Sequence, residues 1–421
     1  MMQEIIEVMS YPWALRALLV SMMVGIMCGV LGCFIVLRNM SLLGDALSHA
    51  ILPGVFFAFL LFGYSAIGFF AGATVAGVLT AVGISWLQQH VQTKNDASIG
   101  IIFTAMFSIG VIGISKISKS DGVHLDLQHF LFGNIFGVTN EDLIITSIVL
   151  VYTLISVVVL YRYLFISTFQ STIAEAMGVS VKTLHYFLMF LLSIVVVASL
   201  SAAGVILVVA MLVTPAATAL LLSNKLKNVL VISALIGLLT TIVGFFVTVV
   251  MDTTPGPAMC LVATMFYLTA VFFSPTQGLI HKAYVKYKEK NRIIHEDVLR
   301  LLEKSKPSKL AIDTIADKLD HSNIRIKQVV QRMLNSKHVI KVSGNFVVLT
   351  ALGDKEAVKM QRAHRLWETY QTREMGIDPE SVHQEAELFE HHLNDDLLSR
   401  VDNKLGFPDT DPHGSPIPRD K

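Results

Sequence analysis

Charged residues are scarce in this chain: Asp, Glu, Lys and Arg make up 15% of its 421 residues, while hydrophobic residues make up 53%. A soluble domain carries roughly 25% charged residues. The deficit is uneven, because single charges interrupt long apolar runs between Trp13 and Pro275 whereas charges crowd together from His281 onward. The sequence therefore predicts a bilayer-embedded part followed by a water-soluble part, here called the tail.

Cysteine is equally rare. The three cysteines, Cys28, Cys33 and Cys260, all lie inside apolar segments. That number and setting argue against a disulfide framework and a thiolate zinc site, and favour small apolar packing roles. The net charge of +1 singles out neither nucleic acid nor a membrane surface as a partner.

Two further absences concern activity and targeting. The sequence has no glycine-rich phosphate loop ending in Lys-Ser or Lys-Thr, so the chain should not hydrolyse ATP itself. No nucleophile–base pair or cofactor loop stands out, which argues against an enzyme. The first residues, MMQEIIEVMS, are acidic where a secretory signal is basic, so the first apolar run is expected to be a retained helix.

The apolar runs predict about nine membrane crossings, because roughly 20 apolar residues span about 30 Å of hydrocarbon. The stretch 185–222 is too long for one crossing and short for two, with Ala202-Ala203-Gly204 as its turn candidate. The candidate spans are 13–37, 44–62, 65–88, 98–116, 143–164, 185–201, 203–222, 228–250 and 257–274.

Positive residues predict which loops are cytoplasmic. They fit one arrangement, in which 185–222 crosses twice, the N-terminus lies outside and the C-terminus lies inside. The positive residues assigned to the cytoplasm are Arg38, Lys94, Arg162, Lys182, Lys225, Lys227, Lys282, Lys286, Lys288, Lys290 and Arg292.

Asp45 and His49 are ionisable residues in the second apolar segment. Standing four apart, they project from one face of a helix. A carboxylate with an imidazole suits Mn²⁺, Zn²⁺ or Fe²⁺, and ionisable residues within a span usually face a polar pathway. The spacing equally fits a charge at the cytoplasmic boundary, because Asp45 lies soon after Arg38.

The stretch Arg38–Ala50 (RNMSLLGDALSHA) resembles the signature of the manganese/zinc/iron ATP-binding-cassette permeases. The resemblance covers roughly residues 10–275 and implies a dimeric core whose helices line one translocation path. It also implies that Asp45 and His49 are the metal ligands of that path. Further matching motifs are DASIG (96–100), LFGNI (131–135), AGVILV (203–208) and LVTPAATA (212–219).

The cytoplasmic segment FQSTIAEAMGV (169–179) is typical of a short helix closed by glycine. By itself it could be an ordinary connector. The same resemblance implies that this segment docks on a separate ATPase subunit, with Glu175, Ala176 and Gly178 at the contact. Gln170 departs from the family, which often has Asp there. Further partners expected are an extracytoplasmic metal-binding protein and a second permease, either identical or paralogous.

The tail begins with a pattern of three helices and a hairpin over residues 293–353. Helices are expected at His295–Lys304, Leu310–Leu319 and Asn323–Ser336, and strands at 338–342 and 346–350 around Ser343-Gly344-Asn345. This order predicts a winged helix-turn-helix. Its third helix carries Arg325, Lys327 and Arg332, which could contact phosphates or form a solvated face.

Carboxylates and imidazoles then recur at helical spacing. His364 and Glu368 stand four apart, and Glu387, Glu390 and His391 share one face of a later helix. Such a set without thiols suits Mn²⁺ or Fe²⁺. On spacing alone these charges would usually mark a solvated surface.

Residues 293–418, through the ending GFPDTDPHGSPIP, resemble the diphtheria-toxin-repressor family of metal-dependent regulators. Glu387 stands where iron-responsive members have cysteine, which looks like the manganese-responsive branch. Arg300 stands where that branch has a further carboxylate, so the resemblance does not supply one complete two-metal site. The metal ligands that the resemblance implies are Asp297, His364, Glu368, His383, Glu387, Glu390 and His391.

The fold class expected is an all-α polytopic membrane protein with about nine transmembrane helices, plus a cytoplasmic winged-helix and helical metal-binding domain. The predicted parts are a permease domain (1–280), a basic juxtamembrane linker (281–292), a winged helix-turn-helix (293–353) and a helical metal-binding and dimerisation domain (354–421). The location expected is the bacterial cytoplasmic (inner) membrane.

Together these features favour a permease subunit of an ATP-driven importer for a divalent transition metal, Mn²⁺ before Zn²⁺ or Fe²⁺, with a metal-sensing tail. One alternative is a membrane-tethered, metal-dependent regulator that binds DNA. Another is an ion-coupled secondary transporter, against which the coupling segment and the lack of paired acidic residues within spans both argue.

Overall fold

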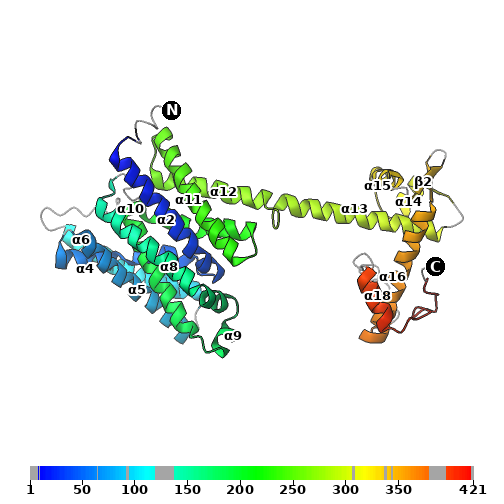
Figure 1. Cartoon of the computed structure of the whole chain (residues 1–421), viewed down its shortest axis with the longest axis horizontal. Coiled ribbons are helices and arrows are strands. Elements are labelled where there is room, and N and C mark those ends of the chain that lie inside the picture. Colours follow the sequence, from blue (N-terminus) through cyan, green and yellow to red (C-terminus); the bar gives the residue numbers. More distant parts are fainter. Residues whose placement is uncertain are drawn as a thin grey trace. The chain divides into compact units, whose positions relative to one another are not determined.

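The computed structural model describes residues 8, 10–63, 65–91, 94–118, 137–305, 309–335, 339–342, 345–378 and 395–418. The chain divides into two compact units, Met1–His281 and Lys282–Lys421, which are described separately (Figure 1).

The regular elements of the first unit are all helices among its described residues. Nine of its helical stretches are long and apolar enough to cross a membrane, which confirms the number of crossings predicted from the sequence. The helices are α2 (Pro12–Leu37), α3 (Leu42–Ala50), α4 (Leu52–Phe62), α5 (Ala66–His90), α6 (Asn95–Ser118), α8 (Asn140–Phe169), α9 (Ser171–Ala176), α10 (Val181–Leu222), α11 (Leu226–Met251) and α12 (Pro255–Phe273).

The second span is broken into α3 and α4 at Ile51. Pro53 occupies the first turn of α4, where its missing N–H costs no hydrogen bond; inside a continuous helix it would remove one. The backbone N–H groups of Gly54 and Val55 both donate to the Ile51 carbonyl, at 2.9 and 3.2 Å. The break ends the helix that carries Asp45 and His49.

Two of the predicted crossings share the helix α10, which is interrupted at one residue. Gly204 has φ 75° and ψ 165°, a conformation that a side chain disfavours. The stretches on either side, Val181–Leu200 and Ala203–Leu222, each have the length and hydropathy of a span. A kink at Gly204, near the start of the second stretch, rather than a loop, therefore breaks the helix between the two crossings.

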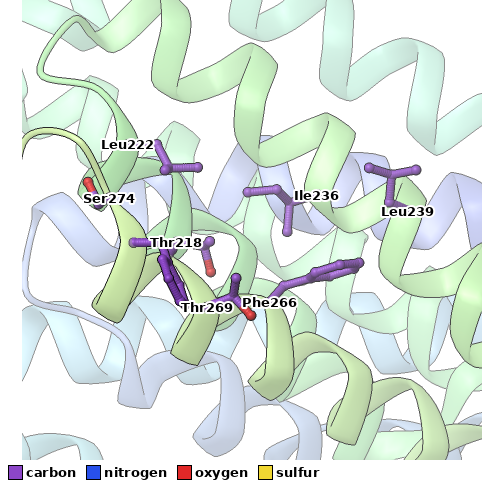
Figure 2. Close-up of a pocket in the computed structure, with 9 residues that line it drawn as sticks. Thr218, Leu222, Ile236, Leu239, Phe266, Thr269 and Ser274 are labelled. Atoms are coloured by element: carbon purple, nitrogen blue, oxygen red, sulfur yellow. The ribbon is translucent and has the colours of Figure 1, made fainter. Parts of the chain in front are cut away.

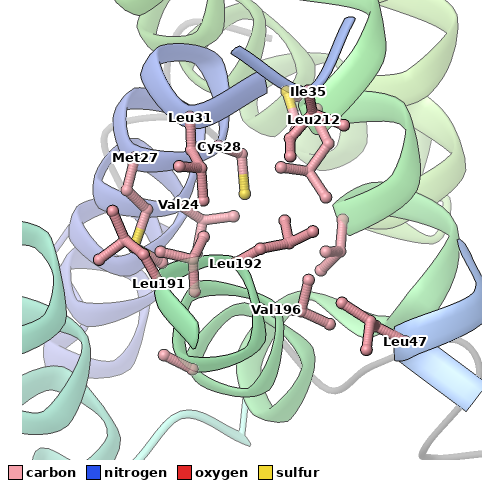
Figure 3. Close-up of a cluster of buried hydrophobic side chains, with 14 of the residues drawn as sticks. Val24, Met27, Cys28, Leu31, Ile35, Leu47, Leu191, Leu192, Val196 and Leu212 are labelled. Atoms are coloured by element: carbon pink, nitrogen blue, oxygen red, sulfur yellow. The ribbon is translucent and has the colours of Figure 1, made fainter. Parts of the chain in front are cut away.

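Helix α2 lies at the centre of the first unit, with nearly three quarters of its apolar window buried. Its glycines permit close backbone contact with α11: a Cβ on Gly25 would lie 2.5 Å from the carbonyl oxygen of Gly237. The Ser233 hydroxyl donates to the Gly29 carbonyl at 2.7 Å. In Figure 3, α2 contributes Val24, Met27, Cys28 and Leu31 to the core, and α10 contributes Leu191, Leu192, Val196 and Leu212. Cys28 and Cys33 are buried packing residues, as predicted.

An apolar pocket of about 220 Å³ lies where the second half of α10 meets α11 and α12 (Figure 2). Its polar lining consists of the hydroxyls of Thr218, Thr269 and Ser274. No carboxylate, imidazole or thiol lines it, so this pocket does not supply metal ligands.

The second unit begins with a helix that is longer than predicted. Helix α13 runs continuously from Leu279 to Lys304, so the basic segment 281–292, expected to be a linker, is helical. The remaining elements are β1 (Leu310–Ala311), α14 (Ile312–Lys318), α15 (Asn323–Asn335), β2 (Val339–Val342), β3 (Phe346–Leu349), α16 (Ala351–Met375) and α18 (Asp395–Lys404).

The predicted hairpin is present. Strands β2 and β3 pair antiparallel, and β1 joins the other edge of β3. A core of apolar residues from α13, α14, α15 and β3 holds this sheet against the helices: Val298, Ile315, Ile326, Val330, Met333 and Val347. A second, smaller core joins Leu366 of α16, Val401 of α18 and Ile417.

Candidate functional site

Asp45 and His49 lie on α3, and the imidazole Nε2 is 3.8 Å from the carboxylate Oδ1. The His49 side chain is 22% exposed and that of Asp45 is 53% exposed. Helical spacing places both on one side of α3, while Leu43 and Leu47 are fully buried. The structure therefore brings the predicted transport pair together, with the carboxylate accessible.

Aromatic side chains of α6 hold the imidazole. The rings of Phe103 and Phe107 have centroids 5.8 and 5.7 Å from that of His49, and the second contact is edge-on. Sequence reasoning did not identify either phenylalanine, because they are more than fifty residues away in an apolar run with no local signal. They restrict the orientation of the histidine.

The pair offers one oxygen and one nitrogen ligand. Among the residues that the structure describes, no group of three or more His, Cys, Asp or Glu side chains could hold a metal. Any further ligands to an ion at the pair would thus be water, main-chain oxygens, other polar side chains or groups beyond the described residues. Mixed oxygen and nitrogen donors suit divalent manganese, iron and zinc.

Helix α9 is a short, separate helix, as predicted. It begins after Gln170, whose backbone is non-helical, and ends at Ala176, two residues before Gly178 with its φ of 80°. Ala174 is fully buried and anchors it, whereas Glu175, Ala176 and Gly178 are exposed. Ile173 and Met177 are exposed apolar residues on the same segment, which the sequence reasoning did not single out.

In the second unit His364 and Glu368 form a close pair on α16. Nε2 of His364 lies 3.0 Å from Oε1 of Glu368, and the side chains are 7% and 2% exposed. They line a pocket of about 170 Å³ together with residues from α13 and from the end of the chain. The other charged or imidazole-bearing lining residues are Arg300, Glu303, Lys304, Arg365, Asp411 and His413.

The segment after α18 closes this pocket through Arg365. Its Nε lies 3.6 Å from Oδ2 of Asp411, and its Nη1 donates to the Pro416 carbonyl. Asp411 in turn accepts hydrogen bonds from the backbone N–H groups of His413 and Ser415, at 2.9 and 2.8 Å. Asp411 and His413 were not among the predicted ligands, although they lie in the matching motif at the chain end.

The remaining predicted ligands are not assembled in the described residues. Asp297 is half-buried on α13, and the α13 residues that line the pocket are the later Arg300, Glu303 and Lys304. His383, Glu387, Glu390 and His391 lie outside the described residues, so their role stays a prediction.

The third helix of the winged-helix part, α15, places Lys327 and Arg332 at the surface and leaves Arg325 half-buried. Nη2 of Arg332 donates to the Tyr287 hydroxyl at 3.3 Å, and its guanidinium lies 6.0 Å from the ring centroid. The hydrogen bond from Arg332 lowers the pKa of the Tyr287 phenol. One of the three candidate phosphate-contacting residues, Arg332, therefore contacts α13.

Comparison with known proteins covers both parts of the chain. Residues 10–274 match the ABC 3 transport family, and residues 350–419 match the metal binding and dimerisation domain of iron dependent repressors. The manganese transport system membrane protein MntC of Halalkalibacterium halodurans is 43% identical over 274 residues, which are 65% of this chain and 91% of that protein. The manganese import system permease protein ScaB of Streptococcus parasanguinis is 40% identical over 280 residues, 66% of this chain and 96% of that protein.

A solved structure agrees with the match of the permease part. The PsaBC complex of Streptococcus pneumoniae with a Fab contains a chain that is 38% identical and superimposes with a TM-score of 0.60. The superposition covers 68% of this chain and 99% of that one. The resemblance predicted from the motifs is thus confirmed for both parts: this chain is a membrane-spanning permease that belongs to the ABC 3 transport family and carries a C-terminal domain of the iron-dependent-repressor type.

Proposed function

We propose that this chain is the permease subunit of an importer for divalent manganese. The observation that carries the proposal is the pair Asp45 and His49 on α3, in a chain about 40% identical to manganese permeases over nearly their whole length. Iron and zinc accept the same donor types, so they are the competing substrates.

In this proposal Asp45 and His49 bind the ion in transit. A carboxylate lowers the cost of bringing a doubly charged ion into a low-dielectric region, and a neutral imidazole adds a second bond. Two protein ligands bind less tightly than a complete set, which suits an ion that must leave again. Phe103 and Phe107 keep the imidazole oriented toward the carboxylate.

The energy comes from a separate ATPase subunit that docks on α9 through Glu175, Ala176 and Gly178. The exposed side chains of Ile173 and Met177 support this role, because a six-residue helix anchored by one buried alanine has an apolar surface left to cover. An extracytoplasmic binding protein delivers the metal, and two permease chains, identical or paralogous, enclose the path. The positively charged loops support a cytoplasmic C-terminus in a bacterial cytoplasmic membrane.

The tail is the sensor of cytoplasmic metal. The buried pair His364 and Glu368 supports this role, because its oxygen and nitrogen donors fit Mn²⁺ or Fe²⁺. Asp297, His383, Glu387, Glu390 and His391 complete the proposed ligand set. When these residues hold metal, the tail inhibits further uptake.

Metal-stimulated ATPase activity of the reconstituted complex tests the transport function. We expect Mn²⁺ to stimulate more strongly than Zn²⁺ or Fe²⁺, and Asp45→Ala and His49→Ala to abolish the stimulation. His90→Gln, which alters an exposed imidazole on α5, is the matched control and should behave like the wild type. Stimulation that persists in both α3 variants would reject the proposed ligands.

A membrane-tethered DNA-binding regulator is the second candidate, favoured by the winged-helix order of α13, α14, α15 and the hairpin. Phosphate contacts would make binding of the 282–421 unit to duplex DNA steeply salt-dependent. If this unit does not bind duplex DNA in the presence of Mn²⁺, the DNA-binding function is rejected and metal sensing remains the proposed role of the tail.

A further inference from the structure

Arg38 ties the end of α2 to the end of α8. Its Nη2 donates to the Ser167 hydroxyl at 2.8 Å, and its Nε donates to the Thr168 hydroxyl at 3.2 Å. Ser167 is buried, and its hydroxyl donates a hydrogen bond to the Leu164 carbonyl at 3.2 Å. The hydroxyl oxygen can therefore accept a hydrogen bond from the guanidinium. The two bonds together fix both the distance and the angle between the helix ends, because the guanidinium is planar and rigid.

The two sides of this tie lead to the two functional elements of the permease. After Thr168 the chain passes through the non-helical Gln170 directly into α9, the proposed docking helix. After Arg38 it passes through Asn39, which has φ 55°, and one short turn into α3, which carries the transport pair. The backbone leaves little slack on either side.

The helix ends around the tie are not held by dense packing everywhere. A pocket of about 270 Å³ is lined by Leu37 and Phe169, the immediate neighbours of Arg38 and Thr168, and by residues from the end of α10 and the start of α11. Protein interiors are otherwise close-packed. On this side the polar contacts of Arg38 therefore add to the apolar packing of Leu37 and Leu164 in holding the α2 end against the α8 end.

We propose that Arg38 is a positioning residue that transmits the movement of α9 on the ATPase to α3, and so couples ATP hydrolysis to release of the metal from Asp45 and His49. This inference rests on the proposed transport function. Lysine cannot replace arginine here, because one ammonium cannot reproduce the paired Nε and Nη2 geometry. A role limited to capping the α8 end predicts loss of stability without a change in coupling.

The test measures Mn²⁺ uptake and ATP hydrolysis in proteoliposomes that contain the full complex. In Arg38→Gln we expect uptake per ATP to fall by about tenfold, as the loss of charged hydrogen bonds predicts. ATPase activity should stay within about twofold of the wild type. The uptake per ATP of Arg38→Lys should lie between that of the wild type and that of Arg38→Gln. The exposed Arg162→Gln on α8 removes one positive charge from the helix that Arg38 contacts and should leave the ratio unchanged.

A second variant removes the partners and keeps the cation. Ser167→Ala with Thr168→Val should lower uptake per ATP as Arg38→Gln does, and combining all three changes should add nothing. An unchanged ratio in this double variant overturns the inference, as does a proportional fall in uptake and ATPase activity. If the wild-type complex itself moves no Mn²⁺, the proposed function fails instead, so the two failures are distinguishable.

Discussion

His364 and Glu368 of the tail form an imidazole–carboxylate contact of 3.0 Å from which water is almost excluded. Burying two ionisable groups is costly unless each compensates the other or both bind a metal. Such pairs are therefore concentrated where proteins bind ions or perform chemistry. The neighbouring Asp411 and His413, brought in by the chain end, give this pocket further donors.

Removing one member of this pair should lower both the stability of the tail and its response to metal. We expect Glu368→Ala to lower the free energy of unfolding of the 282–421 unit by about 3 kcal/mol, because an uncompensated buried imidazole remains. Mn²⁺ should raise the melting temperature of the wild-type unit and not that of the variant. Glu356→Ala, which removes an exposed carboxylate of the same helix, is the control. An equal Mn²⁺ response in Glu368→Ala would exclude this pair as a metal ligand.

Metal binding to the tail should set the level of Mn²⁺ uptake. The triple variant Glu387→Ala, Glu390→Ala, His391→Ala removes three proposed ligands, so its tail should no longer register metal. We expect Mn²⁺ uptake by cells with this variant to continue at internal metal levels that stop uptake by the wild type. Uptake that shuts off at the same internal level in both proteins would remove the sensing role.

Close contact between α2 and α11 should be sensitive to a single methyl group. A Cβ on Gly25 would approach the Gly237 carbonyl oxygen to 2.5 Å, closer than non-bonded atoms allow. Gly25→Ala should therefore destabilise the permease by about 1–3 kcal/mol and lower its melting temperature in detergent. Gly100→Ala, where a Cβ meets nothing within 4 Å, should have no such effect. Equal melting temperatures for both variants would show that the helices can separate without cost.

Titration of Tyr287 should report on Arg332. The hydrogen bond from Arg332 favours the phenolate and lowers the pKa of Tyr287. In Arg332→Gln the pKa should rise toward the ordinary tyrosine value, visible as a shifted absorbance titration of the 282–421 unit. Because the folded pKa is depressed, this contact adds most to stability above the ordinary tyrosine pKa, and the gain is lost as pH falls through the folded value. The Arg325→Gln variant, which alters a more distant cation, should change the titration less.

Much of the architecture could be predicted from the sequence because it depends on short-range constraints. The length of each apolar run determined that it crosses the bilayer as a helix, since backbone groups in hydrocarbon must be satisfied within the segment. Spacing of four residues determined that Asp45 and His49 share one face of their helix, and that His364 and Glu368 share one face of theirs. The motif order identified both parts of the chain.

What the tertiary structure decided involves residues far apart in the chain. Phe103 and Phe107 reach His49 from α6, and the His364 pocket is lined by Arg300 from α13 and by Asp411 and His413 from the segment after α18. The tie between Arg38 and Ser167 spans well over a hundred residues. Local periodicity carries no information about such pairs, because their distance is set by how helices pack.

The same contrast between local pattern and tertiary packing explains why the predicted linker, residues 281–292, is part of helix α13. Its basic residues 281–292 look like a solvated linker because they lack an apolar stripe of their own. They nevertheless continue the helix that begins at Leu279, whose later turns bury Ile294 and Val298 in the core of the second unit. Helix formation is cooperative, so a packed segment extends helical structure into neighbouring turns that would not form it alone.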